Sequence, residues 1–77
     1  MNSPQAHNDQ PVGHVIERTD EVPPMYFSLK VGRDNAQPSG GWTQDRSQAT
    51  IMTKEQAQTR LDGGLSSFAP FCKVVPK

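Results

Sequence analysis

Four side chains in this sequence are of the types that bind metal ions or act as nucleophiles, namely His7, Asp9, His14 and Cys72. Their spacing matches no zinc pattern, because Cys72 stands far along the chain from both histidines. Catalysis by Cys72 with His14 would require the N-terminal segment to fold back, and no third group that would orient the imidazole is visible. Free cysteine usually behaves as a small buried hydrophobe. We therefore expect a structural Cys72 and no metal ligand.

Acid–base chemistry would need a pair of carboxylates, and phosphate binding would need a glycine-rich loop; the sequence gives little evidence for either. Asp34 and Asp45 could be read as a carboxylate pair, but both stand among turn-forming residues, where aspartate is common for structural reasons. The glycines of residues 32–41 lack the Gly-x-Gly-x-x-Gly spacing and the Lys-Ser/Thr ending of phosphate loops. The sequence therefore predicts no catalytic residue, no cofactor and no metal, and we expect a protein that is not an enzyme.

Binding residues are better represented than catalytic ones. Tryptophan and arginine are enriched where protein-binding energy concentrates, and Arg33, Trp42 and Arg46 lie in or beside the glycine-rich stretch. The only tryptophan of a small domain can instead close one end of its core, and this alternative stays open for Trp42. With Trp42 exposed, the three residues predict a surface for a protein partner.

A second binding class is nucleic acid. Several RNA-binding modules stack bases on sheet aromatics that are flanked by basic residues, and Tyr26, Lys30 and Lys73 fit that description. Against it, eight basic and eight acidic residues give zero formal net charge, so no general attraction for phosphate is present. Nucleic-acid binding on an open sheet face is therefore the alternative to protein binding.

The size and composition set outer limits. A chain of 77 residues forms one domain with a thin core. A single cysteine excludes an intramolecular disulfide and favours a reducing compartment. Residues 1–10 lack the basic and apolar regions of a signal peptide, and no stretch is long enough to span a bilayer. We expect a cytoplasmic protein with no membrane partner.

The composition divides the chain after residue 24. Residues 1–24 hold four of the seven prolines among many polar residues, and so few aliphatic side chains cannot offset the entropy of ordering. The sequence predicts a flexible segment at residues 1–24 and a small α+β domain at residues 25–77. The aliphatics of residues 12–18 leave one alternative, an edge strand added to this sheet or to a partner's sheet.

Within residues 25–77, hydrophobic patterning predicts three strands and one helix. Residues 25–31 alternate apolar and polar side chains as a half-buried strand, residues 32–41 form a long exposed loop, and residues 49–52 and 68–75 form two further strands. Thr53 and Gln56 form a capping box that starts a helix, with Met52 and Ala57 as its hydrophobic staple. Gly63 and Gly64 end it in the left-handed conformation.

These elements follow the order strand, strand, helix, strand. A right-handed crossover through the helix makes the second and third strands parallel, and the first strand lies between them. The predicted sheet is three-stranded, in the order 2-1-3, with the helix on one face. An outer strand, either residues 49–52 or the one that contains Pro70, leaves backbone groups that can pair with a second copy, so we expect a homodimer.

Three segments together resemble small accessory proteins of bacteriophages and prophages. They are YFxLKVG at residues 26–32, GWxxD at residues 41–45 and AxxMTxExA at residues 49–57. The resemblance transfers no site residue. It implies a small cytoplasmic protein, often without enzymatic activity, that acts by binding a host or phage protein, for example as a modulator or inhibitor of a host protein.

Overall fold

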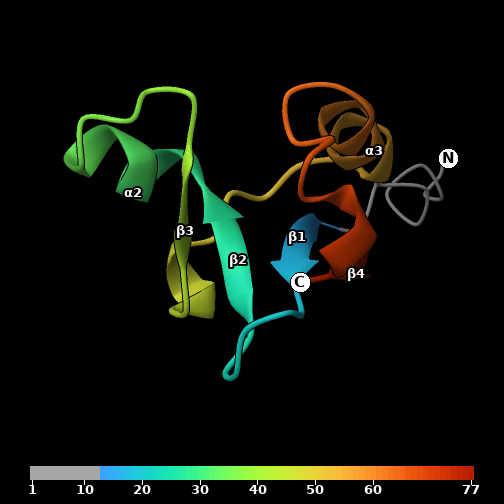
Figure 1. Cartoon of the computed structure of the whole chain (residues 1–77), viewed down its shortest axis with the longest axis horizontal. Coiled ribbons are helices and arrows are strands. Elements are labelled where there is room, and N and C mark those ends of the chain that lie inside the picture. Colours follow the sequence, from blue (N-terminus) through green and yellow to red (C-terminus); the bar gives the residue numbers. More distant parts are fainter. Residues whose placement is uncertain (1–12) are drawn as a thin grey trace, which may run out of the picture.

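The computed structural model describes residues 13–77 and contains one antiparallel sheet with a helix on one face (Figure 1). In chain order the elements are β1 (His14–Arg18), β2 (Met25–Ser28), α2 (Leu29–Asp34), β3 (Gly41–Thr43), α3 (Lys54–Asp62) and β4 (Cys72–Pro76), with 3₁₀ turns at Arg46–Gln48 and Ala69–Phe71. The α+β class is confirmed. The predicted three-stranded sheet is wrong, because four strands pair in the order β3-β2-β1-β4 and all pairs are antiparallel.

Strand β1 lies inside the sheet, between β2 and β4. It pairs along its whole length with β4, from His14 opposite Pro76 to Arg18 opposite Cys72, and Val15 and Ile16 are fully buried. The expected domain start at residue 25 therefore falls beyond a central strand, and the flexible-segment prediction is wrong for β1. The alternative, a strand added to this sheet, is confirmed as a strand, but the strand lies inside the sheet and not at its edge. Residues 1–12 lie outside the described part of the chain.

Strands β1 and β2 diverge, and residues 48–52 fill the gap between them. His14 and Met52 exchange backbone hydrogen bonds of 2.9 Å in both directions, while the Thr50 N–H donates to the Phe27 carbonyl at 2.9 Å. This segment makes a single bridge and is not the strand predicted at residues 49–52. It is also not an outer strand, so it offers no edge for the predicted dimer.

Strand β2 ends at Ser28, where the alternating pattern predicted a strand as far as residue 31. The Ser28 hydroxyl donates to the Gln48 carbonyl at 2.7 Å and accepts the Val31 N–H at 3.0 Å, so it caps α2. The first part of the predicted loop is therefore helical. The loop is also closely packed at Gly40, where φ is +123° and an added Cβ would collide with the Phe27 ring.

Helix α3 begins as predicted. The Thr53 hydroxyl accepts the Gln56 N–H, and the Gln56 side chain accepts the Thr53 N–H, both at 3.0 Å. Ala57 and Leu61 are buried and pack with Ile16, Phe27 and Met52. The predicted left-handed glycine end is wrong: Gly63 has φ −119°, and the Arg60 carbonyl instead accepts the N–H of Leu65 at 2.8 Å.

Both faces of the sheet are covered. Cys72 and Val74 of β4 pack toward α3, whereas Val75 packs with Val15, Tyr26 and Ala49 on the opposite face. This explains why apolar residues occupy both sets of alternate positions along the last strand. Within residues 13–77, no helix has the length and apolar character needed to cross a bilayer.

Candidate functional site

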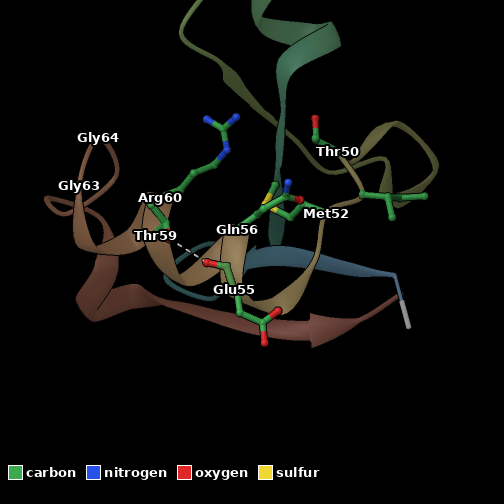
Figure 2. Close-up of a pocket in the computed structure, with 9 residues that line it drawn as sticks. Thr50, Met52, Glu55, Gln56, Thr59, Arg60, Gly63 and Gly64 are labelled. Carbon is green, nitrogen blue, oxygen red and sulfur yellow. Dashed lines mark hydrogen bonds between the residues drawn. The ribbon is translucent and has the colours of Figure 1, made fainter. Parts of the chain in front are cut away.

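Two neighbouring hollows share Arg60 and Gly64 in their linings. The first, the helix hollow, is an open depression of about 720 Å³ between α3 and the segment before it (Figure 2). It is lined by Thr50, Ile51, Met52, Glu55, Gln56, Thr59, Arg60, Gly63 and Gly64. The second, the aromatic hollow, encloses about 590 Å³ between the loop after α2 and the loop after α3. Its lining consists of Phe27, Ala36, Gln37, Pro38, Ser39, Gly40, Trp42, Arg60, Gly64, Leu65 and Phe68.

Helical spacing puts the polar side chains of α3 into the helix hollow. Gln56, Arg60 and Gly64 follow one another at intervals of four, so they share one side of the helix and the turn beyond it. The Thr59 hydroxyl donates to the Glu55 carbonyl at 2.9 Å, and Gln56 is used by the capping box. In Figure 2 the guanidinium of Arg60 and the carboxylate of Glu55 point in opposite directions. Within residues 13–77, neither charged side chain of this lining, Glu55 or Arg60, forms an ion pair.

Three aromatic rings form a ladder along the aromatic hollow. Phe27 and Trp42 meet edge to face with their centroids 6.0 Å apart, and Trp42 and Phe68 do so at 5.3 Å. The Arg18 guanidinium lies over Trp42 at 5.4 Å and over Phe68 at 5.0 Å. Such contacts each contribute about 0.5–1.5 kcal/mol beyond simple burial and hold the rings in fixed orientations.

Arg18 itself is held by acidic neighbours. Its Nε and Nη2 donate to the two carboxylate oxygens of Asp20 at 2.6 and 3.0 Å, and Glu21 lies 3.9 Å away. The hydrogen bond from Arg18 lowers the pKa of Asp20. The charge over the Trp42 ring is therefore neutralised within the fold.

Arg60 has a different environment. Its Cζ lies 5.2 Å from the centroid of the Phe27 ring, and the residue is half-buried. No carboxylate in residues 13–77 pairs with it. The other cations that lack an ion pair there are all exposed to water, namely Arg33, Arg46, Lys54 and Lys77. Arg60 is thus a stacked, partly desolvated cation at the junction of two hollows.

The three residues predicted to bind a protein do not come together. Trp42 is half-buried against the core and also lines the aromatic hollow. Arg46 lies across the sheet, over the Tyr26 ring at 5.5 Å, and donates to the Pro76 carbonyl. Arg33 is exposed in α2, away from both linings. Only Trp42 belongs to the hollows.

The alternative residues for nucleic acid are engaged within the fold. Tyr26 is 8% exposed, and its hydroxyl donates to Glu17 at 3.1 Å. Lys73 pairs with the same carboxylate at 3.4 Å, and Lys30 pairs with Asp34 at 2.8 Å. The Tyr26 ring is therefore unavailable for stacking, and both lysine charges are balanced.

The groups first considered for chemistry have local roles. Asp45 caps a 3₁₀ turn by accepting the Ser47 N–H and hydroxyl, and these bonds lower its pKa. Burial raises the pKa of the Cys72 thiol, although Arg18 opposes the shift, so the thiol stays protonated at neutral pH. In residues 13–77 no three side chains of metal-ligand type form a group. His7 and Asp9 lie outside the described residues.

The sequence interpretation missed Arg60 and Phe68 as members of one site. The interval of four from Gln56 to Arg60 could have indicated a shared side of α3. Nothing local could have indicated that the loop at residues 36–40 lies opposite Phe68. Comparison with protein-family models, with curated proteins and with solved structures gives no match.

Proposed function

We propose that this chain is a non-enzymatic binding module that holds a protein partner in the helix and aromatic hollows. The observation that carries the proposal is Arg60, a half-buried cation that has no acidic partner within residues 13–77 and lies beside the ladder of Phe27, Trp42 and Phe68. Protein-binding energy concentrates in well-packed aromatic and arginine side chains. A site whose rings are already ordered loses less entropy on binding.

The resemblance to phage accessory proteins extends this proposal. It makes the partner a cytoplasmic host protein whose activity the chain modulates or inhibits.

The related proposal of a homodimer now concerns the outer edge of β4 or β3. Pro76 lacks an N–H, and its carbonyl accepts Arg46, so the β4 edge has fewer groups for pairing. Sedimentation that shows only a monomer at micromolar concentration would end the dimer proposal.

Nucleic-acid binding has less support. It would depend on Tyr26, Lys30 and Lys73, whose ring or charge is already used within the fold. Single-strand affinity that falls steeply between low and moderate salt would revive it.

Affinity capture from a host lysate tests the proposal. The wild-type chain should retain a defined protein, Arg60→Gln and Trp42→Ala should lose most of it, and Arg33→Gln should retain it, because Arg33 lies outside both hollows. Circular dichroism would establish that each variant is folded. Equal capture by all four proteins would contradict the proposed site, and retention of no protein would contradict the proposed function.

A further inference from the structure

Two arginines on this face stack on aromatic rings, but only one of them has an acidic partner within residues 13–77. Arg18 lies over Trp42 and Phe68 and binds both oxygens of Asp20. Arg60 lies over Phe27 and has no acid in residues 13–77. A guanidinium carries five N–H donors in a planar fork that matches the two oxygens of a carboxylate. Arg60 is therefore placed for a carboxylate that the described residues do not supply.

The nearby side chains cannot fill that role. Glu55 lines the same hollow, but its carboxylate points away from the Arg60 guanidinium (Figure 2). Asp62, two residues beyond Arg60, accepts a hydrogen bond from Gln58 at 3.1 Å and lines neither hollow. Within residues 13–77, therefore, no acid pairs with Arg60, and its position is open to the carboxylate of a bound molecule.

The residues around Arg60 indicate the size and the chemical character of the rest of the ligand. On one side stand Trp42, Leu65 and Phe68, which form an apolar wall. On the other side lies the helix hollow, and each space is within the 300–1,000 Å³ typical of ligand sites. Arg60 is the only cation in either lining. One positive charge suits one carboxylate, whereas a nucleic acid presents a phosphate at every nucleotide and is held by several cations.

We infer that the ligand is a linear peptide segment of the partner that carries an Asp or Glu side chain next to a bulky apolar side chain. The carboxylate pairs with Arg60, and the apolar side chain packs against Trp42 and Phe68. This inference rests on the proposed function, since it names the part of the protein partner that enters the hollows.

The experiment uses the full chain and a displayed library of random dodecapeptides. Selection on the wild-type chain should enrich peptides with an acid beside an aromatic or large aliphatic residue. One enriched peptide is then synthesised with its acid intact and as the matching amide, and each is titrated against the chain. Trp42 is the only tryptophan and lines the aromatic hollow, so its fluorescence reports binding there.

The acidic peptide should bind the wild-type chain about 10- to 100-fold more tightly than its amide, as expected for a charge-assisted hydrogen bond. In Arg60→Gln this ratio should fall to about twofold or less. Arg60→Lys keeps the charge without the planar fork and should give an intermediate ratio. Lys54→Gln removes an exposed charge of the same helix, outside both linings, and should leave the ratio unchanged.

Three results would overturn the inference: a library without binders, enriched peptides without an acid, or an acid-to-amide ratio that survives in folded Arg60→Gln. In each case, lysate capture that still depends on Trp42 would leave the proposed function standing with a different ligand. Loss of that capture as well would remove the proposed function.

Discussion

Replacing Ile16 by alanine should destabilise this protein more than its place in a polar, proline-rich segment suggests. Ile16 lies at 0% exposure in β1 and packs with Phe27 and Met52 of the core and with Ala57 and Leu61 of α3. Truncation removes apolar contact and leaves a cavity, which costs about 2–5 kcal/mol for Ile to Ala in protein cores.

The structure places this change in the upper half of that range. Strand β1 is hydrogen-bonded to β4 along its whole length and to β2 at one end, so it cannot move toward the cavity without breaking these ladders. We therefore expect a loss of about 3–5 kcal/mol. A domain of this length has a total stability of about 4–12 kcal/mol, so the variant should lose a large part of its stability.

Ile51→Ala is the matched control, because it is the same substitution at a residue that is 58% exposed. It should cost about 1 kcal/mol or less. Urea unfolding followed by circular dichroism measures both variants. With a slope of about 1 kcal/mol per molar urea for a domain of this size, the two midpoints should differ by at least about 2 M. Equal midpoints would refute the central position of β1, as would a folded chain after deletion of residues 1–18.

Four further outcomes are expected. Ala36 has φ +60°, so Ala36→Gly should raise the urea midpoint through about 0.5–1 kcal/mol of relieved strain; a lower midpoint would contradict this. Thr53→Ala should cost about 1 kcal/mol, since it removes the cap of α3, and an unchanged midpoint would show that the cap is dispensable. Arg18 lowers the pKa of Asp20 in the folded state, so the unfolded chain takes up that proton first as the pH falls. Stability should therefore be lost in the acid range below the ordinary aspartate pKa, and less steeply in Asp20→Asn. The thiol of Cys72 should react slowly with iodoacetamide at pH 7 and faster in urea, because burial raises its pKa; equal rates would contradict that burial.

The candidate site was predictable only in part, and the reason is the distance in sequence between its members. Trp42 was identified from its type alone. The other rings come from β2 and from the loop after α3, and Arg60 comes from α3. Arg33 and Arg46, which are nearer to Trp42 in sequence, lie elsewhere, because α2 and the sheet carry them away.

The sequence by itself determined the start of α3, the buried residues Ala57 and Leu61 and the α+β class. The start of α3 depends on hydrogen bonds between residues three apart, and the spacing of the apolar residues indicates which side of the helix is buried, so both can be predicted from local sequence. Only the tertiary structure decided the place of β1, the end of β2 at Ser28 and the meeting of the two hollows at Arg60. The β1 backbone is satisfied by β4, more than fifty residues away in sequence, and Ser28 is held by the Gln48 carbonyl. Partners this far apart in sequence leave no local pattern. The polar composition around β1 therefore predicted a flexible segment, although two aliphatic residues of β1 are buried in the fold.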